Sequence, residues 1–410
     1  MYIFENCRVF DGESENVLEG AFVSVQDGKV EGVGFNSTDL KSADRLRINC
    51  AGRLLMPGLI DAHIHAYTPT FSFYNNDRLP DSLMANHAAV ILEGMLKRGF
   101  TTVRDAGGGD KGLWLAIEQG LIKGPRLFYA GKAISQTGGH GDMRPGELIE
   151  PCGCSGYSGS ISRVADGPDE VRKVVREELR KGAHQIKLFA SGGVTSPNDP
   201  AWMNQYSEEE IRIAVSEAAT RRTYVMAHCL TDESIRRCVE YGVRSIEHGT
   251  GITDETAKFI AKNDAFVVPT LSVAHVLRER GPELALPPAS LDKIKGLYES
   301  YLSSIEACNR AGVKLGLGAD LLGHEYHPLQ GGELALRGEV CKPIDVLRSA
   351  TSINAELLQQ SGKLGCIKPG AYADLLVLDF DPFKNLDGFK EPEKNIPLVM
   401  KGGQLVRSLL

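Results

Sequence analysis

Two histidines separated by one residue, His63 and His65, end the apolar run PGLIDAHIH. In a β-strand, positions i and i+2 point to the same face, so both imidazoles would enter the same space. Imidazoles in a packed interior need polar partners, and one metal ion can satisfy two of them. The pair therefore indicates a metal site rather than two structural histidines.

Three further candidate ligands also end short apolar runs. His228 closes TYVMAH, His248 closes RSIEH and Asp320 closes KLGLGAD. Taken singly, each histidine is equally consistent with a hydrogen-bonded core residue, but their shared position at successive run ends favours metal ligation. A buried carboxylate at Asp320 needs a metal or a cation, and a salt bridge is the alternative.

A lysine inside an otherwise apolar run is the most diagnostic residue of the chain. Lys187 lies in HQIKLFASGG, where an unpaired ammonium would be costly to bury. The simpler interpretation is a lysine paired with an acid. The sharper one is a neutral amine that has added carbon dioxide, because the carbamate so formed is an anion able to bridge two metals.

These residues sit in a regular alternation of short β runs and amphipathic helical segments. The helical segments 169–182 and 207–222 begin near an Asp or Ser cap with acids in the first turn. Eight such β/α units predict an α/β fold of the (β/α)8 TIM-barrel type, with the metal-binding side chains at its C-terminal mouth. The eight β runs span residues 58–65, 101–108, 126–134, 184–193, 223–230, 245–250, 266–271 and 314–320.

Both ends of the chain are rich in strands. Asp27-Gly28 and Gly402-Gly403 are hairpin turn signals within β-rich segments. Neither terminal segment alone would bury much core. We therefore expect one small β-sandwich domain from residues 1–56 plus 358–410, and a catalytic barrel from residues 57–357.

Composition limits the class of protein. The 410 residues carry 46 Lys and Arg against 53 Asp and Glu, a net charge of −7 that argues mildly against nucleic acid or an anionic membrane as partner. The chain shows no apolar run long enough to span a bilayer, no signal peptide, and an odd count of nine cysteines. These features predict a cytoplasmic enzyme with reduced thiols, in which Cys152 and Cys154 are loop thiols rather than metal ligands.

The strand motifs MPGLIDAHIHAY, IKLFASGG, AHC, IEHG and GLGAD, in this order, resemble those of the amidohydrolase superfamily. The runs TTVRDAGG and GGHGD are similar to its imidazolonepropionase-related branch, which includes prolidase-like dipeptidases and carboxypeptidases. The resemblance covers nearly the whole chain and implies a centre of two Zn²⁺ ions. It assigns His63, His65 and Asp320 to the more buried ion, His228 and His248 to the other, and carbamylated Lys187 to both.

The implied reaction is attack on an amide carbonyl by a hydroxide that the two zinc ions share. Asp320 would carry the proton to the leaving nitrogen, and His140, in the glycine-rich loop QTGGHGD, would contact the substrate carbonyl. Weaker candidates for the substrate pocket are Tyr206, Arg104, His275 and His324.

Several functions stay open at this point. The leading one is hydrolysis of a dipeptide or an N-acyl amino acid, with Xaa-Pro favoured, in a protein we expect to be a homo-oligomer. A cyclic amide hydrolase of the hydantoinase or imidazolonepropionase kind is second. A deaminase fits less well, because Lys187 is present and Glu233 lies five residues past His228. A non-catalytic binding protein would have lost at least one ligand, and all candidates are present.

Overall fold

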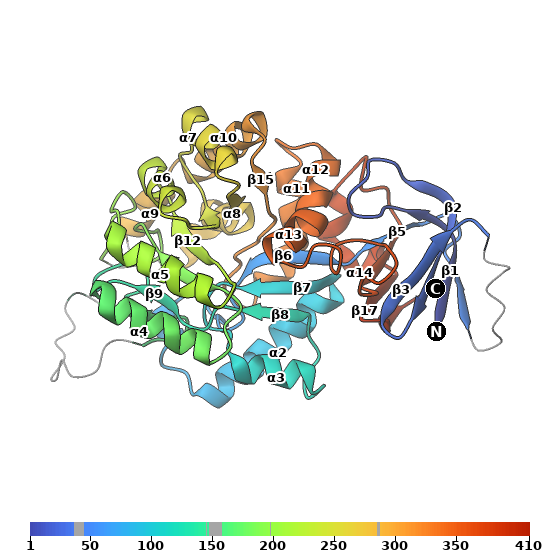
Figure 1. Cartoon of the computed structure of the whole chain (residues 1–410), viewed down its shortest axis with the longest axis horizontal. Coiled ribbons are helices and arrows are strands. Elements are labelled where there is room, and N and C mark those ends of the chain that lie inside the picture. The colour runs from blue at the N-terminus through green and yellow to red at the C-terminus, as the bar shows by residue number, and fades with distance from the viewer. Residues whose placement is uncertain (37–44, 145, 147–157, 197, 285–287) are drawn as a thin grey trace.

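The computed structural model of this chain describes residues 1–36, 45–144, 146, 158–196, 198–284 and 288–410 (Figure 1). Cys152 and Cys154 lie outside the described residues, so the interpretation of these two thiols stays a prediction. Among the described residues, no helix combines the length and apolar character that crossing a membrane requires.

Eight parallel strands form the centre of the fold, and each coincides with a predicted β run. They belong to two sheets, one ordered β6-β7-β8 and the other β10-β9-β11-β12-β13-β14-β15. The eight are β6 (Leu59–Ile64), β7 (Phe100–Asp105), β8 (Arg126–Tyr129), β11 (Ile186–Phe189), β12 (Val225–Cys229), β13 (Ser245–His248), β14 (Phe266–Val268) and β15 (Lys314–Leu315).

Backbone hydrogen bonds connect these two sheets at both edges. The Ala62 amide of β6 donates to the Leu317 carbonyl just past β15, at 2.8 Å. At the other edge, the His184 amide just before β11 donates to the Tyr129 carbonyl of β8, at 2.9 Å. The eight strands thus follow one another side by side in chain order, an arrangement consistent with the predicted (β/α)8 barrel.

The third β run differs from the prediction of one strand over 126–134. It divides into β8 and β9 (Ala133–Ser135), and β9 pairs with β10 (Ser162–Val164). Gly131 lies between the two pieces with a φ of +73°, a left-handed conformation that ends the extended run.

Helices cover the outside of the strands, from α2 in light blue through green and yellow to α11 in orange in Figure 1. Their apolar faces pack on the sheet, as expected for amphipathic crossover helices. In chain order they are α1 (Phe73–Asn76), α2 (Asp81–Lys97), α3 (Lys111–Glu118), α4 (Gly167–Arg180), α5 (Glu208–Thr220), α6 (Asp232–Glu240), α7 (Asp254–Lys262), α8 (Leu271–Arg280), α9 (Pro288–Ile294), α10 (Leu297–Ala311) and α11 (Gly332–Arg337).

A helical stretch from Pro343 to Leu357 follows these helices. It consists of α12 (Pro343–Arg348), a π-helical turn and α13 (Asn354–Leu357). Short 3₁₀ turns cover Gly281–Leu284, His327–Gly331 and Asp387–Lys390, and α14 spans Pro392–Asn395.

Strands from both ends of the chain lie in a single eight-stranded sheet, in blue and red in Figure 1. Both predicted hairpin turns are confirmed, because Gln26 pairs with Lys29 and Lys401 pairs with Gln404. The order is β18-β17-β16-β5-β1-β2-β3 with β4 beside β1, so the expected two-layered sandwich is not confirmed. Its strands are β1 (Tyr2–Val9), β2 (Leu18–Gln26), β3 (Lys29–Gly34), β4 (Leu46–Asn49), β5 (Leu54–Pro57), β16 (Leu375–Leu378), β17 (Leu398–Lys401) and β18 (Gln404–Ser408).

Candidate metal centre and active-site pocket

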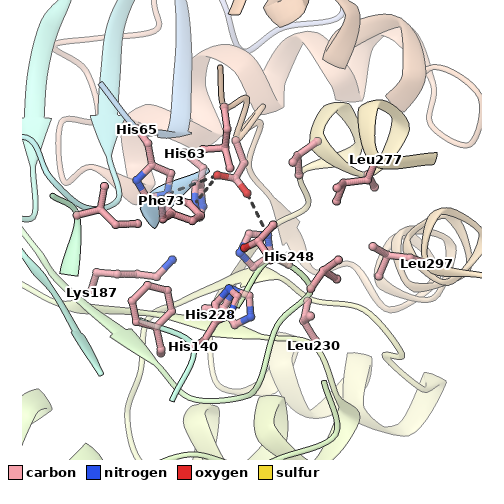
Figure 2. A pocket seen from close by; sticks show the side chains of 18 of the residues that line it. His63, His65, Phe73, His140, Lys187, His228, Leu230, His248, Leu277 and Leu297 are labelled. Carbon is pink, nitrogen blue, oxygen red and sulfur yellow. Dashed lines mark ion pairs between the residues drawn. The ribbon is translucent and has the colours of Figure 1, made fainter. Parts of the chain in front are cut away.

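A pocket lies at the carboxyl ends of the central strands (Figure 2). The structure brings seven predicted site residues together in its wall: His63, His65, His140, Lys187, His228, His248 and Asp320. Most of the remaining lining is apolar: Phe73, Met143, Ile161, Phe189, Val194, Leu230, Val273, Leu277, Leu297 and Leu322. A polar cluster inside an apolar wall is the usual form of an enzyme pocket.

Three of the predicted ligands form a compact cluster. Asp320 Oδ1 lies 3.5 Å from His63 Nε2 and 3.4 Å from His65 Nε2, and one donor atom from each residue falls within 4.8 Å of the others. Dashed lines in Figure 2 mark these pairs. Two imidazoles and a carboxylate at this separation are a donor set that suits zinc.

His63 on β6 and His65 just after it are each oriented by a partner at the second ring nitrogen. His63 Nδ1 lies 2.6 Å from Glu247 Oε2, and His65 Nδ1 lies 2.9 Å from the Gly107 carbonyl. Metal-binding histidines typically use the second ring nitrogen in this way. Both Nε2 atoms therefore face Asp320, and His63 Nε2 is buried without a hydrogen-bond partner in the described structure. An unpartnered imidazole nitrogen facing a carboxylate is the environment that a metal ion would satisfy.

His228 and His248 lie on the adjacent strands β12 and β13, with ring centroids 4.5 Å apart. His248 also approaches the first cluster, because its ring centroid lies 5.0 Å from that of His63. His248 Nδ1 lies 2.8 Å from Thr270 Oγ1, and His228 Nε2 lies 3.2 Å from the Gly192 carbonyl. In each of these two imidazoles, one ring nitrogen thus contacts a neighbouring oxygen and the other is left for another partner.

Lys187 is buried between the two histidine pairs in the wall of the pocket (Figure 2). Within the part of the chain that the structure describes, its ammonium forms no ion pair, and Nζ lies 5.4 Å from the centroid of the Phe189 ring. The simpler interpretation, a lysine paired directly with an acid, is therefore not what the geometry shows.

Burial determines the protonation of these groups. Desolvation holds the pKa of His63, His228 and His248 well below the usual value and lowers that of His65 to about 4. The imidazoles are therefore neutral near pH 7, as ligands must be. Desolvation also lowers the pKa of Lys187, although the carboxylates of Glu247 and Asp320 oppose this.

His140 lies in the pocket beside the predicted metal ligands, as the glycine-rich loop suggested. Its ring stacks on His228 with centroids 4.3 Å apart, and its Nδ1 lies 2.6 Å from Ser196 Oγ and 3.3 Å from Asp199 Oδ2. A Cβ on Gly193 would come within 1.9 Å of this ring, so only glycine leaves room for it. His140 is thus held with one edge toward the pocket.

The four weaker substrate candidates do not line this pocket. Arg104 is fully buried below it, where it donates to Glu247 at 2.8 Å and to the Ala62 carbonyl. The Tyr206 hydroxyl donates to the Ala165 carbonyl in the packed core. The remaining two lie elsewhere: His275 against Tyr298 and His324, an exposed residue, beside His87.

Several residues that support the site were not predicted. Glu247 joins His63 to Arg104, and Thr270 orients His248. Thr270 stands near the end of its predicted β run, the position that identified the histidines, whereas Glu247 lies inside its run just before His248. Ser196 and Asp199 lie in a loop with no motif, and nothing in their spacing indicates a role.

Two of the predicted ligands have a left-handed backbone. His248 has a φ of +71° and Asp320 a φ of +50°, a conformation that is uncommon for residues other than glycine. Such conformations persist where the surrounding structure imposes them, and they concentrate at functional sites. The two strand ends are therefore shaped to aim these side chains inward.

The sequence and the fold have clear counterparts among known proteins. Residues 54–406 match the amidohydrolase family. The chain belongs to this family and is a hydrolytic enzyme of the class that acts on amide C–N bonds. The predicted family and the predicted enzyme class are therefore confirmed.

Individual relatives give a narrower picture. Ochratoxinase from Aspergillus niger is 33% identical over 378 residues, which cover 86% of this chain and 76% of that protein. A prolidase solved with N-methylphosphonate-L-proline is 43% identical with a TM-score of 0.95, covering 99% of both chains. A Xaa-Pro dipeptidase with methionine bound in its active site is 27% identical with a TM-score of 0.88, covering 98% of this chain and 99% of that one.

Proposed function

We propose that this chain is a zinc-dependent hydrolase with a two-metal centre that cleaves the amide bond of dipeptides or N-acyl amino acids. One observation carries the proposal: among the described residues, the buried Nε2 of His63 has no hydrogen-bond partner, and it faces Asp320, with His65 and His248 beside it. The donor set of His63, His65 and Asp320 fits zinc, and His228, His248 and Lys187 would supply the ligands for a second ion.

The residues would divide between the two ions as follows. His63, His65 and Asp320 would hold one ion, and His228 and His248 the other, because these are the sets that lie together. Lys187 lies between the sets and forms no ion pair with any residue that the structure describes, and as a carbamate it would supply the shared anion. When bound, the two ions polarise the carbonyl and make water acidic enough to attack it near neutral pH.

Side chains of the protein would transfer the proton and contact the substrate carbonyl. Hydrolysis forms a bond from the water oxygen to the acyl carbon, breaks the C–N bond and leaves one proton for the nitrogen. Asp320 is placed to accept that proton from the attacking water and deliver it to the nitrogen. His140, held by Ser196 and Asp199, would donate to the carbonyl oxygen as negative charge develops on it.

The lining of the pocket supports a substrate with a large apolar group. Lys187 is the only lysine or arginine among the described residues that line it, and ten of the lining side chains are Phe, Leu, Ile, Val or Met. An apolar acyl group or side chain next to the scissile amide would bury well here. The prolidase and ochratoxinase relatives favour an amino-acid amide, with Xaa-Pro first and a cyclic amide as the alternative.

Zinc-loaded protein assayed against Xaa-Pro dipeptides, N-acyl amino acids and cyclic amides tests the proposal. We expect amino acid release from the first two groups and ammonia release from none. Ammonia release without amino acid release would show a deaminase and contradict the proposal, and turnover of the cyclic amides alone would establish the alternative.

Leu277→Ala is expected to lower kcat/KM roughly tenfold for substrates with an aromatic acyl group, and little for acetyl substrates, because the lost contact is apolar. Val276→Ala is the matched control, since Val276 is buried on the same helix without lining the pocket. Equal losses for aromatic and acetyl substrates would exclude Leu277 from selectivity.

The domain division belongs to the same proposal. We assign catalysis to residues 57–357 as one closed barrel, and a β-sandwich to residues 1–56 with 358–410. The single sheet built from both termini and the bonds that link the parallel sheets support this division.

A further inference from the structure

Helix α8 begins differently from the other helices of the chain that follow a Ser or Thr cap. In α5, α6 and α7 the hydroxyl of Ser207, Thr231 or Thr253 accepts from the backbone amide three residues on. This is the usual way to satisfy a free amide at a helix start. Helix α8 also has a threonine at this position, Thr270, yet its side chain makes no capping hydrogen bond.

The Thr270 hydroxyl is used for another purpose. Its Oγ1 lies 2.8 Å from His248 Nδ1 and 3.3 Å from the Tyr301 hydroxyl. With Nδ1–H donating to Oγ1, the lone pair of His248 Nε2 is left for a metal ion. The hydroxyl that would otherwise cap α8 therefore fixes both the orientation and the tautomer of a proposed ligand.

A carboxylate from a later helix caps the N-terminus of α8 instead. Glu333 on α11 is fully buried and accepts from the backbone amides of Ser272 at 2.7 Å and Leu271 at 3.3 Å. These are the first two amides of α8, which lack partners within the helix. A carboxylate there also interacts favourably with the positive end of the helix dipole.

We propose that Glu333 is a positioning residue for the metal centre, because it caps α8 and so keeps the Thr270 hydroxyl available to His248. The inference rests on the proposed function, in which His248 binds a metal. Without the carboxylate, the first amides of α8 lose their acceptor and the Thr270 hydroxyl becomes the nearest replacement. His248 would then lose the partner that fixes its ring.

Titration of metal-free protein with Co²⁺, followed by its visible absorption, tests this link without relying on turnover. We expect wild type to bind two ions and Glu333→Gln to bind the weaker one about tenfold less tightly, with a changed spectrum. Thr270→Val should show the same change, and the double variant should be no worse than Thr270→Val alone. Thr253→Ala is the matched control, because it removes a helix cap far from the pocket and should lower Tm while leaving both affinities unchanged.

The outcomes separate this inference from the proposed function. If wild type binds two ions and Glu333→Gln binds both with wild-type affinity and spectrum, the positioning role is wrong. If wild type binds only one ion, the two-metal function itself fails, and this inference with it. Should Glu333→Gln not fold, Glu333→Asp keeps the charge beside Arg337 and shortens the reach, and unchanged binding there would equally overturn the inference.

Discussion

Lys187→Ala is expected to lower kcat/KM on the order of 10³-fold. The variant removes the side chain that lies between the two histidine pairs and that we propose to be the shared anionic ligand. Losing several kcal/mol of transition-state stabilisation corresponds to a rate loss of this size. Short carboxylic acids added to the variant should restore part of the activity, because they can supply the missing carboxylate in the space left by the side chain.

Lys173→Ala is the control for this experiment, since Lys173 is exposed on α4 and far from the pocket. It should keep wild-type activity. NMR of wild type with ¹³C-bicarbonate should show a carbamate signal that Lys187→Ala lacks. A Lys187→Ala variant with more than a tenth of wild-type activity would refute the bridging role.

Asp320→Asn is expected to lower kcat about 10³-fold with a much smaller change in KM. The amide keeps the size of the side chain but cannot accept and return a proton, and general acid–base catalysis typically contributes about 10²–10⁴-fold. Measuring kcat and KM of wild type and variant, with a substrate identified among the dipeptides and N-acyl amino acids, checks that kcat falls much more than KM changes.

Exposed Asp292 on α9 provides the matched change, because Asp292→Asn removes one carboxylate outside the pocket and should leave kcat unaltered. If Asp320→Asn raised KM and left kcat intact, Asp320 would act in substrate binding instead. A proton-transfer role would then have to move to another group.

The strand-end positions of the ligands were predictable because they follow from local pattern. An apolar run that ends in a histidine or aspartate specifies both a buried strand and the place where its polar residue emerges. His63, His228, His248 and Asp320 therefore reach the same pocket, although they come from distant parts of the sequence. Parallel strands bring their carboxyl ends to one edge, so chain order alone groups these residues.

The layer in which an inward-facing side chain lies was not predictable from the same pattern. Arg104 lies on a predicted β run, as the ligand candidates do, and was a weaker candidate for the substrate pocket. Inward side chains of a barrel occupy successive layers, and Arg104 is fully buried outside the layer of predicted ligands, where it donates to Glu247 and Ser245. The alternation of a strand specifies which face a residue is on, but not which layer it fills.

Contacts between residues from distant parts of the chain could not be predicted from the sequence either. The pairing of His63 with Glu247 spans 184 residues, and the capping of α8 by Glu333 spans 61 and 62 residues. Such contacts depend on the packing of whole elements rather than on spacing. The third β run shows the same limit, because Gly131 divides it where apolar pattern predicts continuity.

Titration of metal-free protein with Zn²⁺, with amino acid release as the readout, tests the two-metal hydrolase most directly. Each chain should reach full activity at two equivalents of zinc, and zinc analysis of the active protein should give two ions per chain. A plateau at one equivalent, or full activity without bound metal, would contradict the account.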